Sequence, residues 1–143
     1  MVKIQKFIDT PSQTAGPFLH IGCTPRITGI NIFKSELGLT PFQDISDNEA
    51  INIKGKIYDG NTEPIIDAMI ETWQCDANGK YSSNQGFARI VTDFKTGEYQ
   101  LKTIRPGNKI NTDESLSASY ITFWIVARGM NRPLITRMYF LEN

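Results

Sequence analysis

The sequence has 143 residues, of which 40% are hydrophobic and 21% are charged, and its 15 basic residues balance its 15 acidic residues. A chain of this length is expected to form one compact domain that folds without disulfide bonds. The zero net charge argues against binding to nucleic acid or to an anionic membrane, because both partners usually select a basic excess.

The two cysteines, Cys23 and Cys75, are far apart and neither belongs to a Cys-x-x-Cys pair, so the sequence does not indicate a zinc site. The N-terminal residues contain no apolar run typical of a signal peptide, and no segment reaches the length of a membrane-spanning helix. We therefore expect two reduced thiols in a cytoplasmic protein.

The first 50 residues are predicted to be irregular. Prolines punctuate them, and a proline disfavours helix both at its own position and at the preceding residue; they are Pro11, Pro17, Pro25 and Pro41. One short helical turn is expected around residues 32–37. We interpret residues 1–50 as an arm that lies on a domain formed by residues 51–143, so that the chain has one structural domain in total.

From residue 51 onward the hydrophobic residues recur with a period of two, which is typical of half-buried strands. Turn dipeptides such as Asp59-Gly60 and Asn78-Gly79 interrupt this pattern. Polar residues 108–117 are predicted to form a loop. Strands are expected at residues 51–57, 66–73, 87–94, 98–104, 120–127 and 134–140. The pattern predicts an all-β fold with a single β-sandwich.

Few residues form a pattern that specifies chemistry. His20 is the only histidine, so no Ser/His/Asp or Cys/His catalytic set can be assigned. Tyr81 is expected either to pack over the edge of the sandwich or to present its hydroxyl at a pocket. Arg128 lies between an apolar strand and Gly129. It is expected to pair with a nearby carboxylate or to bind the carboxylate of a ligand, since a guanidinium fork matches that group.

Two longer motifs point to a known family. Residues 10–18 read Thr-Pro-Ser-Gln-Thr-Ala-Gly-Pro-Phe, and residues 71–81 run from Glu-Thr-Trp-Gln through a turn to Tyr81. With residues 104–107 and the last two strands, these motifs resemble the protocatechuate 3,4-dioxygenase subunits of the intradiol dioxygenase family, and most of all the alpha chains. The resemblance implies an alpha–beta heteromer in which Fe(III) and O2 open the ring of protocatechuate, giving 3-carboxy-cis,cis-muconate.

The same resemblance implies that this chain has lost the iron site. In the family, the beta chain holds iron with two tyrosines and two histidines. Their positions fall here on Tyr81, Lys109, Tyr120 and Thr122, of which only Tyr81 keeps the family's residue, and a pocket arginine falls on Ser117. Because imidazole is a strong ligand for iron, loss of both histidines is expected to abolish binding. We expect no catalytic residue and no metal in this chain alone, and Fe(III) in a beta-type partner.

The residues that an alpha chain lends to its partner's pocket are retained. By resemblance, Thr14, Gly16 and Pro17 match the arm that reaches the partner's active site, and Phe18 stands where alpha chains often have tyrosine. Arg128 matches an arginine near the substrate pocket. The expected partners are a beta-type dioxygenase subunit and, through its site, a catechol-type substrate such as protocatechuate, in a hetero- or homo-oligomer.

Three functions remain open at this level. The leading hypothesis is an alpha-type, metal-free subunit that completes a partner's active site and is inactive alone. The alternative is a non-catalytic β-sandwich binding or interaction module derived from this family, and a third is an enzyme with its own altered metal site. Family members continue for several tens of residues past residue 140. Either a partner is expected to cover the sheet edge that those residues would otherwise cover, or the chain is a degenerate or divergent gene product.

Overall fold

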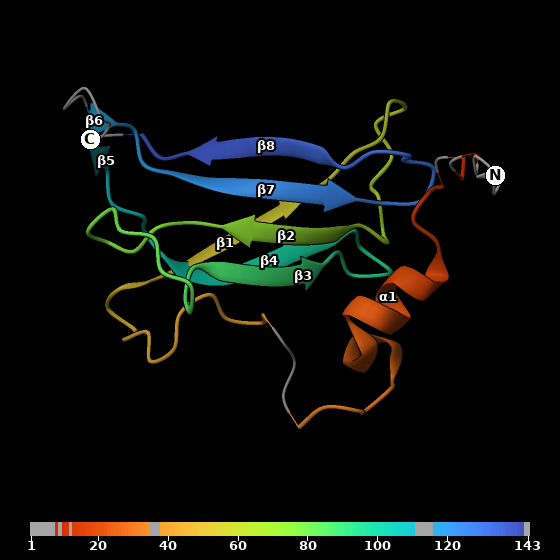
Figure 1. Ribbon diagram of the computed structural model, residues 1–143, viewed down its shortest axis with the longest axis horizontal. Helices are drawn as coiled ribbons and strands as arrows, with labels where there is room; N and C mark the ends of the chain where they lie inside the picture. The colour runs from red at the N-terminus through yellow and green to blue at the C-terminus, as the bar shows by residue number, and fades with distance from the viewer. Residues whose placement is uncertain (1–7, 9, 12, 35–37, 111–115, 142–143) are drawn as a thin grey trace, which may run out of the picture.

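The computed structural model describes residues 8, 10–11, 13–34, 38–110 and 116–141. Its strands form a four-stranded sheet and a two-stranded sheet that pack together, with the N-terminal segment along one side (Figure 1). The β-sandwich predicted from the sequence is therefore confirmed. In the described part of the chain, no helix is long and apolar enough to cross a membrane.

All strand pairs are antiparallel. The larger sheet has the order β3-β2-β7-β8, formed by β3 (Phe87–Val91), β2 (Met69–Trp73), β7 (Tyr120–Val126) and β8 (Leu134–Tyr139). The second sheet pairs β1 (Ala50–Lys56) with β4 (Glu98–Ile104). A short third pair joins β5 (Lys109–Ile110) to β6 (Leu116–Ser117).

The core lies between the two main sheets because alternate residues of each strand point inward. Ile121, Phe123 and Ile125 of β7 pack with Ile70 of β2 and Leu101 of β4, and all are buried. Burying a side chain of this kind stabilises the fold by about 1.5–3 kcal/mol. The sandwich is thus held mainly by apolar contact between the sheets.

A buried polar contact also joins the two sheets at one end. Gln74 follows β2, and its side-chain oxygen accepts a hydrogen bond of 2.7 Å from the hydroxyl of Thr103 in β4. Its side-chain nitrogen donates to the carbonyl of Ile104 at 3.0 Å. Because a buried amide is costly unless bonded, these contacts fix the relative position of β2 and β4.

The helical turn predicted around residues 32–37 is wrong as far as the structure describes it, since residues 32–34 are not helical and residues 35–37 lie outside the described residues. The helix is earlier, at α1 (Pro17–Cys23), and is followed by a single 3-10 turn, η1 (Pro25–Thr28). Pro17 lies in the first helical turn, where its fixed φ suits a helix and its missing N–H costs nothing.

Other boundaries also differ from the sequence prediction. The strand expected at residues 66–73 begins at Met69, and the one expected at 87–94 ends at Val91. The carboxylate of Asp93 ends β3 by accepting hydrogen bonds from the backbone N–H groups of Lys95 and Thr96, at 2.9 and 2.8 Å.

The loop predicted at residues 108–117 contains the short strands β5 and β6, and residues 111–115 lie outside the described residues. Each of these strands has two residues, too few to show an alternating pattern in the sequence. The division of the chain at residue 50 stays a prediction, although β1 begins at Ala50.

Candidate functional site

The candidate residues form two groups at opposite ends of strand β7. Tyr120 is the first residue of the strand, and Arg128 follows shortly after its last residue. A strand rises about 3.3 Å per residue, so these two positions are roughly 25 Å apart. Helix α1 lies toward the Arg128 end, whereas β5 and β6 lie toward the Tyr120 end (Figure 1). The two groups therefore cannot act on one small ligand.

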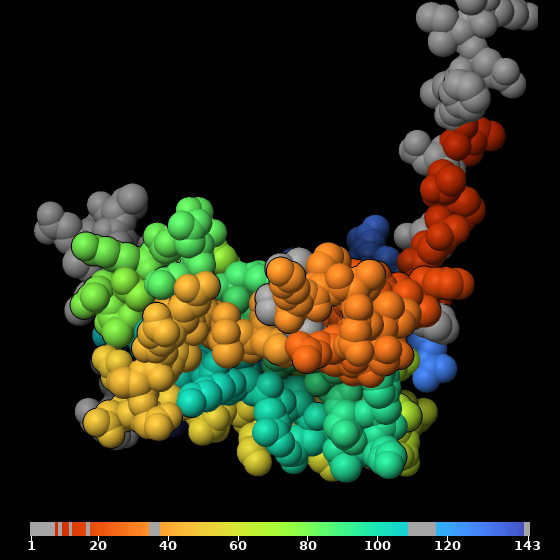
Figure 2. All heavy atoms as spheres, turned by 90° about the horizontal axis from the view of Figure 1, so that it is seen from below, coloured from red at the N-terminus to blue at the C-terminus, as the bar shows by residue number. Residues whose placement is uncertain are grey.

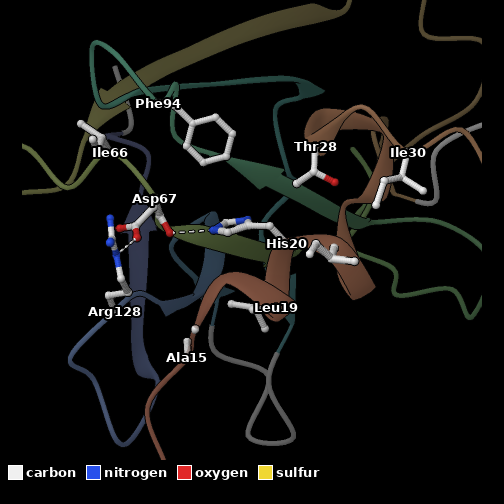
Figure 3. A pocket seen from close by; sticks show the side chains of 11 residues that line it. Ala15, Leu19, His20, Thr28, Ile30, Ile66, Asp67, Phe94 and Arg128 are labelled. Atoms are coloured by element: carbon white, nitrogen blue, oxygen red, sulfur yellow. Dashed lines mark hydrogen bonds and ion pairs between the residues drawn. The ribbon is translucent and has the colours of Figure 1, made fainter.

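The Arg128 end holds a cavity of about 370 Å³ between α1, η1 and the edge of the sandwich. Its walls are largely apolar, and Figure 3 shows the side chains that line it, among them Leu19, Ile30, Ile66 and Phe94. The polar side chains at this cavity are those of His20, Thr28, Asp67 and Arg128, and the hydroxyl of Thr28 donates to the carbonyl of Pro25 at 2.7 Å. An apolar hollow with few polar groups is typical of sites that bind small organic molecules.

Arg128 is held at the rim of the cavity by an ion pair. Its Nε donates to Oδ2 of Asp67, and the side chains point toward one another in Figure 3. The Arg128 side chain is 66% exposed, whereas that of Asp67 is 17% exposed. Gly129 has a φ of +84°, which lets the chain turn sharply just after the arginine. The guanidinium is thus held at its Nε side by Asp67, and its other side faces the solvent.

His20 joins the helix to the same aspartate. Its ring is buried, and Nε2 lies 3.0 Å from the backbone oxygen of Asp67. Because a carbonyl can only accept a hydrogen bond, Nε2 must carry the hydrogen. The ring also meets Phe94 edge-on, with 5.6 Å between the ring centroids. His20 is therefore a packed histidine that fastens α1 to the sandwich.

Of the arm residues predicted to reach a partner's active site, Gly16 lines this cavity and Thr14 and Phe18 are not among its lining residues. Gly16, the N-cap of α1, lines it together with Arg128. Thr14 is exposed, and its hydroxyl donates only to the neighbouring carbonyl of Ala15, at 3.4 Å. Phe18 is 82% exposed, and Pro17 contributes its backbone to the start of α1. The described residues before α1 run outward from the body of the molecule (Figure 2).

The second group is a cluster of aromatic rings at the other end of β7. The hydroxyls of Tyr81 and Tyr120 are 3.5 Å apart, and Trp73 stacks on Tyr81 with 5.9 Å between ring centroids. The guanidinium of Arg137 lies 4.5 Å from the ring centroid of Tyr120, and the ring of Tyr139 packs on the same tyrosine. We call these five residues the phenol cluster.

The phenol cluster does not fit ferric iron. Of the four positions expected to carry the family's iron ligands, only Tyr81 keeps the family's residue, and Tyr120 and Thr122 stand where imidazoles would be needed. Arg137, whose guanidinium is always charged, lies 4.5 Å from the ring centroid of Tyr120, and its positive charge disfavours binding of a cation beside it.

The two remaining positions of the family's iron ligands carry Lys109 and Thr122. Thr122 pairs with Arg137 in the sheet register and offers only a hydroxyl. Lys109 lies in β5 opposite Ser117 in backbone register. Among the described residues, no group of three or more His, Cys, Asp or Glu side chains could hold a metal ion. The single histidine of the chain, His20, lies at the other end beside Asp67, so no imidazole contributes to this group.

One residue of the candidate site was missed at the sequence level. Asp67 precedes β2 as an isolated acidic residue, and no motif marks it as a partner of Arg128 or of His20. The sequence indicates only that Arg128 could pair with a nearby carboxylate, without indicating which one.

Comparison with known proteins assigns the family. A family model described as Dioxygenase matches residues 34–143, and the chain therefore belongs to this dioxygenase family. Within it, the chain is similar to protocatechuate 3,4-dioxygenase alpha chains. It is 36% identical to that of Pseudomonas putida, over 96% of this chain and 72% of the relative, and 31% identical to that of Burkholderia cepacia, over 92% and 69%. Identity to a Burkholderia cepacia beta chain is 27%, over 64% of this chain and 45% of the relative.

Solved structures agree on the fold. Catechol 1,2-dioxygenase from Pseudomonas arvilla C-1 superposes with a TM-score of 0.61 at 20% identity, covering 70% of this chain and 38% of that chain. The dioxygenase domain of a carbohydrate-binding fusion protein from Streptomyces sp. SirexAA-E gives a TM-score of 0.60 at 21% identity, covering 91% and 73%. At this level of identity the likeness extends to the β-sandwich and not to the chemistry.

Proposed function

We propose that this chain is the alpha-type subunit of a protocatechuate 3,4-dioxygenase-like heteromer and that it completes the active site of a beta-type partner. The observation that carries the proposal is Arg128, whose exposed guanidinium is fixed by Asp67 at the rim of a cavity beside the arm. The higher identity to alpha chains than to a beta chain supports the same assignment.

In this proposal the partner supplies the metal chemistry. Fe(III) is bound by the beta-type chain, because Tyr120 and Thr122 of this chain stand where the family's histidine ligands are expected and Arg137 places a positive charge beside them. This chain supplies no catalytic residue and contributes to the pocket that surrounds the substrate. We place the heteromer in the cytoplasm, where the free thiols of Cys23 and Cys75 would persist.

The proposed role of Arg128 is to bind the carboxylate of protocatechuate. Its Nε is used by Asp67, and the rest of a guanidinium can fork onto a second carboxylate. A charge-assisted hydrogen bond of this kind contributes about 1.5–3 kcal/mol. Arg128 would therefore favour an acidic catechol over an uncharged one.

The proposed role of the arm is to reach the partner. We treat residues 1–50 as the arm and residues 51–143 as the sandwich. The described residues before α1 run away from the sandwich (Figure 2), and the exposed ring of Phe18 offers an apolar contact. Thr14, Gly16 and Pro17 would enter the partner's pocket as backbone and small side chains.

The alternative is a binding module that acts without a partner. The observation that favours it is that the cavity of about 370 Å³ is formed by this chain alone, with apolar walls and Arg128 at its rim. Such a cavity could hold a small organic acid directly. In that case the isolated chain would bind protocatechuate without any beta-type chain being present.

Co-expression separates the two functions. This chain carries an affinity tag, a beta-type chain with two tyrosine and two histidine ligands carries none, and the purified material is measured by native mass spectrometry and metal analysis. The proposal predicts equal numbers of both chains, with iron present only when the beta-type chain is present. Recovery of this chain alone, with protocatechuate binding detected by calorimetry, would contradict the proposal and support the binding module.

A further inference from the structure

Asp67 contacts two parts of the candidate site at once. Its backbone oxygen lies 3.0 Å from Nε2 of His20, which belongs to α1, and its carboxylate pairs with Nε of Arg128. The side chain of Asp67 is 17% exposed, compared with 66% for Arg128, so the aspartate is the fixed member of the pair. Figure 3 shows both contacts from one side of the cavity.

Arg128 pairs with Asp67 through Nε, and this choice of atom determines which of its nitrogens can bind a ligand. A contact through Nε takes the inner side of the guanidinium and leaves the two terminal nitrogens on the outer edge. Within the described part of the chain, Asp67 is the one polar partner of Arg128. An exposed arginine without such a contact would occupy many rotamers, and ordering it on binding a ligand would weaken the interaction.

We propose that Asp67 is a positioning residue, which aligns Arg128 for a forked contact with the substrate carboxylate and keeps the arm in place beside it through His20. The inference rests on the proposed function, because it assigns to Asp67 a role exerted through Arg128. By charge alone, the carboxylate of Asp67 would repel the carboxylate of the substrate and weaken its binding.

The charge of Asp67 and its positioning role have opposite consequences. If Asp67 mainly neutralised Arg128, removing its charge would strengthen binding of an anionic substrate. If it mainly positions Arg128, removing the acceptor would weaken binding. Asp67→Asn keeps an oxygen that can accept from Nε, whereas Asp67→Ala removes it. Both variants keep the backbone carbonyl that bonds His20, so α1 retains its attachment.

The experiment uses the reconstituted heteromer with the wild-type chain, Asp67→Ala, Asp67→Asn, Arg128→Ala and the double variant. KM and kcat are measured for protocatechuate and for unsubstituted catechol. Asp67→Ala is expected to raise KM for protocatechuate relative to catechol by roughly 3–30-fold, less than the roughly 10–150-fold expected for Arg128→Ala. Asp67→Asn is expected to recover most of the loss. In the Arg128→Ala background, Asp67→Ala should change the substrate ratio no further, because Asp67 acts through Arg128.

Asp47→Ala is the matched control. It also removes one acidic group, from a surface pair with Lys102 at 3.3 Å, where the Asp47 side chain is 97% exposed. The control is expected to leave the substrate ratio unchanged. A second readout needs no partner: the Nε–H resonance of Arg128 in nitrogen-15 NMR should be protected from exchange in the wild-type chain and lose that protection in Asp67→Ala.

The outcomes separate this inference from the proposed function. If Arg128→Ala changes the substrate ratio and Asp67→Ala does not, the positioning role is overturned while the proposed function stands. If Asp67→Asn and Asp67→Ala both lower KM for protocatechuate, charge neutralisation is the correct account and the inference is overturned. If Arg128→Ala leaves the substrate ratio unchanged, the proposed role of Arg128 fails and the role of Asp67 fails with it.

Discussion

The guanidinium of Arg137 lies 4.5 Å from the ring centroid of Tyr120, at the end of the sheet where family resemblance would place metal ligands. A cation–π contact of this kind is favourable and fixes a positive charge beside the phenols. The same charge would repel a bound cation. We therefore expect the phenol cluster to be an aromatic end of the sandwich that binds no metal.

The first prediction is that the isolated chain binds no stoichiometric iron. Tyr120 and Thr122 stand where the family's two histidines are expected, and Arg137 puts a positive charge beside the remaining phenols. Metal analysis and visible spectroscopy after incubation with Fe(III) test this, because iron bound by tyrosinate is coloured. A coloured preparation with one iron per chain, lost in Tyr81→Phe, would contradict the prediction and support an enzyme with its own altered site.

The second prediction concerns the ionisation of the tyrosines. Burial raises the pKa of Tyr99, and burial with the Tyr120 hydrogen bond raises that of Tyr81, above the ordinary value of about 10. The folded state then holds these protons more tightly than the unfolded state. The contribution of the two tyrosines to the free energy of unfolding is therefore fully present below about pH 10 and is lost as the pH rises further. Ultraviolet titration should show Tyr81 and Tyr99 ionising late.

The control for this titration is Tyr81→Phe, which should remove part of the late phase. If all five tyrosines of the chain ionised together near the ordinary value, the environment described for Tyr81 would be wrong.

The sandwich was predictable because its strands carry a local pattern. The strand at residues 98–104 was predicted with the bounds of β4, since apolar and polar residues alternate along it. The helix α1 was not predicted, because Pro17 was interpreted as a helix breaker although it lies in the first turn, where proline favours a helix. The family motifs predict a substrate-pocket role for Arg128, and that role stays a prediction.

The remainder of the site depends on contacts between distant segments. Asp67 meets Arg128 across 61 positions of the chain and meets His20 across 47. No local period or motif encodes either contact. The contact with Arg128 follows from the antiparallel register of β2 on β7, which pairs Met69 with Val126 and so brings Asp67 opposite Arg128. The contact with His20 follows from the position of α1 beside the residues that precede β2. The Arg137 contact with Tyr120 similarly follows from the register of β8 on β7.

The third prediction is that His20 fastens the arm. His20→Ala removes the hydrogen bond to the Asp67 carbonyl and the edge contact with Phe94, and is expected to destabilise the attachment of α1 by about 1–3 kcal/mol. Hydrogen exchange should become faster in residues 17–23 and stay unchanged in the sandwich core. Phe18→Ala, on the same helix but 82% exposed, should have little effect. Equal protection in His20→Ala and the wild-type chain would show that the arm is held by other contacts.

The fourth prediction concerns Gly86, which has a φ of +91°. A Cβ atom there would lie 2.2 Å from the backbone oxygen of Gln74, next to the contact that joins the sheets. Gly86→Ala is expected to lower the free energy of unfolding by about 2 kcal/mol or more, measured by urea denaturation. Gly60→Ala is the control, because a Cβ at Gly60 has no atom within 4 Å, and a loss of equal size in both variants would contradict the prediction.

The central claim is that this chain completes a partner's active site, and catalytic complementation tests it most directly. A beta-type chain is titrated with this chain while kcat/KM for protocatechuate is measured by oxygen consumption. We predict that kcat/KM rises and saturates at one copy of this chain per beta-type chain, and that Arg128→Ala saturates at the same ratio with a lower kcat/KM. A beta-type chain whose kcat/KM is unchanged at every concentration of this chain would contradict the account.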